Sequence, residues 1–99
     1  MDKIIGYDGK ELKLHIIASP GKLIREELLE RKITQTDFAN RLGMRQSHLN
    51  EVLQGKRRVS AQMALNLEKE FGASAEFWMN LQTRYDLEIE RQKNQEAVA

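Results

Sequence analysis

The side chains best suited to recognition chemistry lie together in residues 45–50, which read Arg-Gln-Ser-His-Leu-Asn. Gln and Asn can form paired hydrogen bonds with adenine in the DNA major groove, Arg favours guanine, and Ser can serve either base. On a helix that turns Leu49 inward, the polar members of this stretch remain outside. The residues that we expect to face a nucleic acid are Arg45, Gln46, Ser47, His48 and Asn50.

These polar residues differ in the contact that each side chain suits. We predict that Gln46 and Asn50 read bases, whereas Arg45 and Ser47 suit either a base or a flanking phosphate. His48 admits two interpretations: it contacts a base or a phosphate, or it is simply solvated on an exposed turn of the helix.

Positive charge gathers around the same stretch. Between residues 41 and 58 the one acid is Glu51, while the cations are Arg41, Arg45, Lys56, Arg57 and Arg58. The formal net charge of the 99-residue chain is only +1, so this basic patch is local. The last three of these cations are typical of a solvated loop, but their position directly after the polar helix favours contacts with phosphates.

Two short helices joined by a tight turn must position these residues. Thr34 stands where the N-cap of the first is expected, and Gly43 suits the left-handed residue that ends it. Gly55 has the same place after the second helix. Two amphipathic helices with such a turn predict a helix-turn-helix, although this unit also occurs as plain packing with no nucleic acid.

The rest of the chain supplies three more predicted helices. Ser19-Pro20 begins the first, with an expected buried stripe of Leu23, Ile24, Leu28 and Leu29. Ser60 caps the fourth helix, which ends at Gly72, and Ser74 caps the fifth, which runs to about Arg91. We therefore expect a mainly α domain over residues 19–91 and a flexible tail over residues 92–99.

Residues 1–18 have a different pattern. Asp8-Gly9 between two short apolar runs is a strong hairpin signal, so this segment is expected to be extended or a β-hairpin. Two strands alone are marginal in water. They must pack on the helices, pair with a partner or stay partly disordered.

The fifth helix carries more apolar side chains than a small core needs. On one interpretation this stripe is a self-association surface, since helix-turn-helix repressors normally act as twofold dimers. On the other, Trp78 closes the core of the monomer. The residues predicted for a dimer interface are Phe77, Trp78, Leu81 and Tyr85.

Composition excludes several other classes of protein. The chain has no Cys and two His on different predicted elements, so we expect no enzyme, no cofactor and no metal site. No apolar run approaches the roughly 20 residues that span a bilayer. The N-terminus lacks the pattern of a signal peptide, and we expect a cytoplasmic location.

Three separated motifs lie around the predicted helix-turn-helix. They are Ser19-Pro-Gly-Lys-Leu-Ile-Arg-Glu-Glu-Leu-Leu-Glu, Gly55-Lys-Arg-Arg-Val-Ser-Ala-Gln-Met-Ala-Leu, and Phe77-Trp-Met-Asn-Leu-Gln with Tyr85-Asp-Leu. Together they resemble the HigA branch of the Xre/Cro repressors, which are antitoxins of toxin–antitoxin operons, and the similarity covers roughly residues 19–90.

The sequence departs from the family pattern at three positions. Ser19 stands where the family usually has His, and Ala75 where it usually has Pro. Arg45 occupies an expected N-cap normally held by Ser or Thr. That helix is therefore weakly capped, or Arg45 serves as a DNA contact instead.

The resemblance implies a five-helix, lambda-repressor-like domain that binds a palindromic operator as a homodimer. It also implies that Gln35 binds phosphate, and that the protein represses its own operon and neutralises a small HigB-like messenger RNA endonuclease. Candidate surfaces for the toxin are the N-terminal strands and the acidic face of Glu26, Glu27 and Glu30. The alternatives are a stand-alone repressor without a toxin and a protein-only adaptor.

Overall fold

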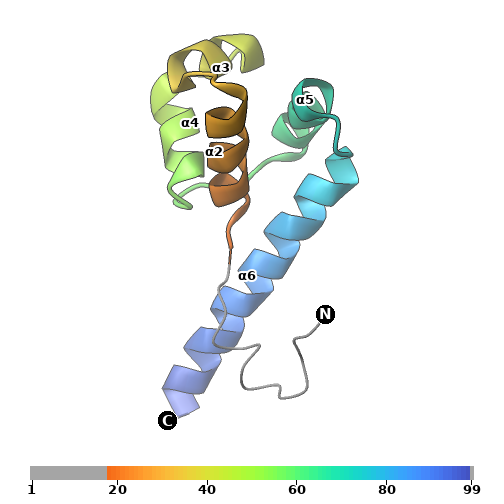
Figure 1. Ribbon diagram of the computed structural model, residues 1–99. Coiled ribbons are helices and arrows are strands. Elements are labelled where there is room, and N and C mark those ends of the chain that lie inside the picture. The colour runs from red at the N-terminus through yellow and green to blue at the C-terminus, as the bar shows by residue number, and fades with distance from the viewer. Residues whose placement is uncertain (1–17, 99) are drawn as a thin grey trace.

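The computed structural model describes residues 18–98, which fold into five helices. The first four gather at one end of the fifth, which extends away from them as a long rod (Figure 1). The predicted mainly α fold is confirmed for this part of the chain, and the predicted N-terminal hairpin lies outside the described residues except for Ala18. The helices are α2 (Pro20–Arg31), α3 (Gln35–Leu42), α4 (Gln46–Leu53), α5 (Ala61–Phe71) and α6 (Ala75–Val98).

Short-range capping bonds set the helix starts where the sequence predicted them. The Thr34 hydroxyl accepts from the backbone N–H of Asp37 at 3.1 Å, and the Ser60 hydroxyl accepts from that of Met63 at 3.1 Å. Such a cap satisfies one of the amides that a helix start leaves unpaired and is worth about 1 kcal/mol. Ser19 and Ser74 cap α2 and α6 in the same way.

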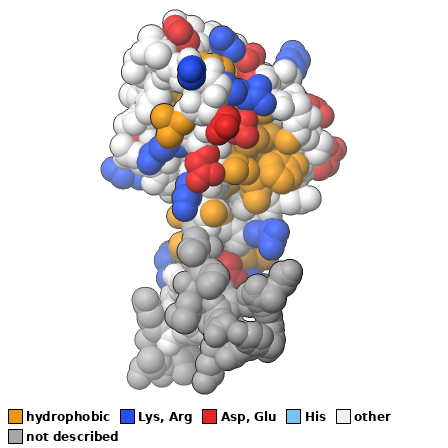
Figure 2. All heavy atoms as spheres, in the orientation of Figure 1, with side chains coloured by type: hydrophobic (Ala, Val, Ile, Leu, Met, Phe, Trp, Pro, Cys, Tyr) orange, Lys and Arg blue, Asp and Glu red, His pale blue; other side chains and the backbone are white. Residues whose placement is uncertain are grey.

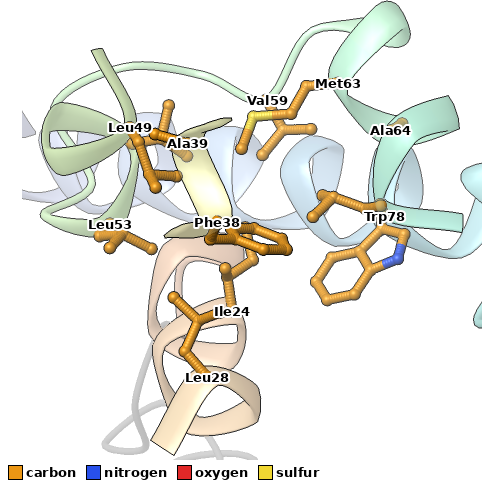
Figure 3. Packing of buried hydrophobic residues seen from close by; sticks show 12 residues of the cluster. Ile24, Leu28, Phe38, Ala39, Leu49, Leu53, Val59, Met63, Ala64 and Trp78 are labelled. Atoms are coloured by element: carbon orange, nitrogen blue, oxygen red, sulfur yellow. The ribbon is translucent and has the colours of Figure 1, made fainter. Parts of the chain in front are cut away.

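The core lies where α2, α3, α4 and α5 meet the first turns of α6. Phe38 of α3 lies between Ile24 of α2 and Trp78 of α6 (Figure 3), and its ring stacks on Phe71 with centroids 5.2 Å apart. Trp78 is 1% exposed, so it closes the core of the monomer. The buried apolar residues are Ile24, Leu28, Phe38, Ala39, Leu49, Val52, Leu53, Val59, Met63, Ala64, Leu67 and Trp78.

Gly21 fixes how closely α2 approaches α4. A Cβ atom at this position would lie 2.1 Å from the carbonyl oxygen of Val52 and 2.8 Å from the Cα of Leu53. Only glycine permits backbone contact of this kind. The end of α4 is also held by Arg25, whose Nη2 donates to the carbonyl oxygen of Leu53 at 3.1 Å.

Two sequence predictions about helix faces and lengths were wrong. Leu29 was assigned to the buried stripe of α2, but it is 73% exposed. Ile24 and Leu28 face the core, and Leu29 lies about 140° from Ile24 around the helix. α6 continues to Val98 instead of ending near Arg91, because residues 92–98 contain no glycine or proline to stop it.

Candidate nucleic-acid interface

α4 is anchored through one apolar face to α2 and α3. Leu49, Val52 and Leu53 are at most 2% exposed, and burying each such side chain stabilises the fold by roughly 1.5–3 kcal/mol. At 100° per residue, Ser47 lies opposite these three residues around the helix, and Gln54 and Glu51 lie on either side of Ser47. The helix therefore presents a polar face to solvent.

The predicted contact residues divide between two sides of that face. Gln46 and Asn50 lie on one side, whereas Arg45, Ser47 and His48 line an open hollow of about 490 Å³ on the other. Glu51 and Arg57 line the same hollow. The structure thus brings Arg57 of the basic run next to the start of α4.

The first turn of α4 has no side-chain cap. Arg45 has the extended backbone of an N-cap, with φ −69° and ψ 144°, but no side-chain oxygen to accept from the following amides. The first backbone N–H groups of α4 therefore have no side-chain acceptor, and the Arg45 side chain beside them is exposed. Of the two interpretations of Arg45, the weakly capped helix is confirmed, and its DNA contact stays a prediction.

The cations after α4 are engaged to different degrees. Arg57 donates through Nε to Oε1 of Glu51 at 2.8 Å, and its Nη2 lies 2.8 Å from the same oxygen as an ion pair. Arg58 donates to Oδ2 of Asp86 from Nε at 3.0 Å and from Nη2 at 2.6 Å. Lys56 is exposed and forms no ion pair with a described residue.

A buried polar link joins this loop to α6, and no local pattern in the sequence indicates it. Gln82 is 3% exposed, and its Oε1 accepts from the backbone N–H of Val59 at 2.8 Å. Its Nε2 donates to Oδ1 of Asp86 at 2.9 Å, and Asp86 also holds Arg58. The loop that carries the basic residues is therefore tied to α6 by side chains more than twenty residues away.

The residues predicted for a dimer interface do not share one environment. Phe77 is 41% exposed and Leu81 is half-buried, but Trp78 belongs to the core. The half-buried Tyr85 points toward Gly55, where a Cβ would lie 3.5 Å from its hydroxyl oxygen. Phe77 and Leu81 thus remain as the surface candidates of this set.

Phe77 borders an apolar hollow of about 290 Å³ where α2 meets the corner between α5 and α6. Figure 2 shows apolar side chains gathered in this region, with charged side chains around them. Arg31 crosses it, with its guanidinium 4.8 Å from the ring centroid of Phe71 and Nη2 donating to the Phe71 carbonyl oxygen at 3.4 Å.

The remaining predictions concern Gln35, metal ions and membranes. Gln35 is the first residue of α3 and is half-buried, and nothing in its contacts tests the expected phosphate role. Residues 18–98 contain no group of His, Asp and Glu that could hold a metal ion. Within the same range, no helix combines the length and apolar character needed to cross a membrane.

Sequence reasoning missed Glu51 and Gln54 as members of the exposed face. Both were detectable, because they lie opposite Leu49, Val52 and Leu53 on a helical wheel. In the linear sequence Glu51 stands out only as the single acid among the cations of residues 41–58. Its pairing with Arg57 depends on the course of the loop after α4, which no helical period describes.

This arrangement defines a helix-turn-helix protein, with α3 as the first helix, Gly43 in the turn and α4 as the second helix. A family described as helix-turn-helix matches residues 24–78, more than half of the chain, and the chain belongs to that family. The expected helix-turn-helix is therefore confirmed.

Two relatives of known name share this region. The chain is 36% identical over 77 residues to virulence-associated protein I of Dichelobacter nodosus, covering 77% of this chain and 71% of that protein. It is 42% identical over 69 residues to virulence-associated protein A′ of the same organism, covering 69% of this chain and 60% of the relative.

Solved structures of antitoxins have the same fold. Antitoxin HigA of Pseudomonas aeruginosa, solved with the higBA promoter, matches with a TM-score of 0.77 and 33% identity, over 84% of this chain and 91% of that one. A HigA-family addiction module antidote protein of Coxiella burnetii gives 0.77 and 32%, over 85% and 92%. The expected resemblance to HigA-type antitoxins is confirmed.

Proposed function

We propose that this protein is a sequence-specific, antitoxin-type repressor that binds a palindromic operator as a dimer. The observation that carries the proposal is α4, which is anchored by a buried apolar face and presents amides and a hydroxyl on its polar face, with Arg45 before the helix and a basic run after it. A rigid helix with such donors and acceptors suits the major groove. The likeness to an antitoxin solved with promoter DNA supports the same function.

The proposed contacts divide into base readers and phosphate binders. Gln46 and Asn50 read bases, while Arg45, Ser47 and His48 contact a base or the adjoining phosphate. Phosphates are bound by Gln35, Lys56, Arg57 and Arg58 on either side of the groove. In the dimer, two copies of α4 read two half-sites, and α6 supplies contacts between the copies through Phe77 and Leu81.

By binding this operator the protein represses its own toxin–antitoxin operon, and it also neutralises a small toxin of the HigB-like messenger RNA endonuclease type. Support comes from the neighbouring structures, which include antitoxins and an antidote protein. This activity needs no catalytic group on the present chain and places the protein in the cytoplasm beside its DNA and its toxin.

The first test is a gel-shift of the full chain with DNA from upstream of its own gene, against a scrambled duplex, at two salt concentrations. We expect preferential binding that weakens steeply with salt, because phosphate contacts release counterions. Binding that fails to distinguish the two duplexes would contradict the proposal and favour the protein-only adaptor.

The toxin is tested separately by coexpression with any small basic protein encoded beside the gene. An antitoxin restores growth that the neighbour arrests, and the two proteins copurify. Operator binding without such a neighbour would instead identify a stand-alone repressor.

A further inference from the structure

Glu51 is an unexpected residue for a surface that faces DNA. It lies one helical turn beyond Ser47 on the exposed side of α4 and in the same hollow as Arg45 and His48. An unmatched carboxylate there is repelled by the phosphates on both sides of a groove. The Glu51 carboxylate is favourable on this surface only if a specific hydrogen-bond donor lies within reach of it.

Arg57 both neutralises Glu51 and holds it in place. Nε and Nη2 of Arg57 converge on a single carboxylate oxygen, Oε1, at 2.8 Å. Neither Oε2 of Glu51 nor Nη1 of Arg57 takes part in a hydrogen bond with a described residue. The two side chains are 45% and 52% exposed, so within the described part of the chain an unused acceptor and unused donors lie side by side at the surface.

This acceptor–donor arrangement is complementary to one base pair in particular. In the major groove, cytosine presents the N4 amino donor, and its partner guanine presents the O6 and N7 acceptors beside it. Carboxylates accept from cytosine N4, and Arg donates to guanine O6 and N7. An A·T pair matches less well, because its one amino donor, adenine N6, lies between the acceptors N7 and thymine O4, so it offers Arg no two adjacent acceptors.

We infer that the Glu51–Arg57 pair reads one C·G base pair in each half-site, with Oε2 of Glu51 accepting from cytosine N4 and Arg57 donating to guanine. The inference rests on the proposed DNA-binding function, adds a specificity determinant to it, and moves Arg57 from the phosphate contacts to base reading. An exposed ion pair with only a structural role contributes little to stability, so it would leave base preference unchanged when removed.

The experiment selects bound duplexes from a pool in which the operator is randomised, using wild type, Glu51→Gln and Glu90→Gln. Glu90 is the control, since it forms an exposed 3.5 Å ion pair with Lys93 on the side of α6 opposite Leu81. We expect wild type and the control to prefer C·G at one position of each half-site by about tenfold or more. Glu51→Gln should lose that preference and keep the others.

Two outcomes would overturn the inference, and they differ from failure of the proposed function. If Glu51→Gln selects the same sequences as wild type, the pair has only a structural role. If Glu51→Gln instead changes the preference at a position where wild type does not select C·G, Glu51 reads another base pair. Selection of no sequence by wild type would instead refute the DNA-binding proposal itself.

Discussion

Gln46 is the side chain at the start of α4 that most directly tests base reading. It is exposed at the first helical position and contributes nothing to the core, so its replacement leaves the fold intact. We expect Gln46→Ala to cost roughly 1–3 kcal/mol of operator affinity and to relax specificity at one base position. Titration of operator variants in gel-shifts measures both effects, and an unchanged sequence preference would refute the assignment.

Lys56 tests the phosphate contacts more cleanly than Arg58, because Asp86 already holds Arg58. We expect Lys56→Ala to weaken binding to all duplexes alike and to lower the slope of log affinity against log salt by about one unit. Lys69→Ala on the exposed side of α5 is the control and should leave the slope unchanged. An equal effect of both variants would show that only net charge matters.

At the scale of the elements, the link between α6 and the loop after α4 depends on Gln82. Gln82→Ala leaves the buried N–H of Val59 without its acceptor, which costs about 1–3 kcal/mol of unfolding free energy. Urea unfolding measures the loss. The control is Gln62→Ala on exposed α5, where we expect a change within about 0.5 kcal/mol.

Gly21 tests how α2 positions α4. Gly21→Ala places a methyl group against the Val52 carbonyl, so α2 must shift, at a cost of about 1–3 kcal/mol. Lys22→Ala, on the exposed neighbouring residue, should change stability little. Thermal or urea unfolding of the two variants separates this backbone contact from helix propensity, and equal stabilities would contradict the tight packing.

The sequence predicted those features that depend on near neighbours. Ser60 and Thr34 cap helices through residues three positions away, and Leu49 with Val52 and Leu53 forms a face that one helical period reveals. The pairing of Arg58 with Asp86 spans 28 residues, so no local pattern contains it. The error at Leu29 has the same origin, because the width of the covered stripe is set by which helices pack against α2.

At the scale of the whole molecule, the operator-binding proposal requires a second copy, and Phe77 is its most exposed candidate contact. We expect Phe77→Asp to convert a dimer into a folded monomer, because a charge buried in an interface without a partner is costly. Operator affinity should fall on the order of 100-fold, since one half-site no longer assists the other. Sedimentation and gel-shifts measure the two effects, and circular dichroism verifies the fold.

Leu29 provides the control for that experiment. It is 73% exposed and lies on the side of α2 away from Glu27 and Arg31, which border the hollow at Phe77. We expect Leu29→Asp to remain dimeric with unchanged operator affinity. If Leu29→Asp is monomeric while Phe77→Asp is not, the two copies contact each other through α2. That contact, and not α6, then sets the distance between the two copies of α4.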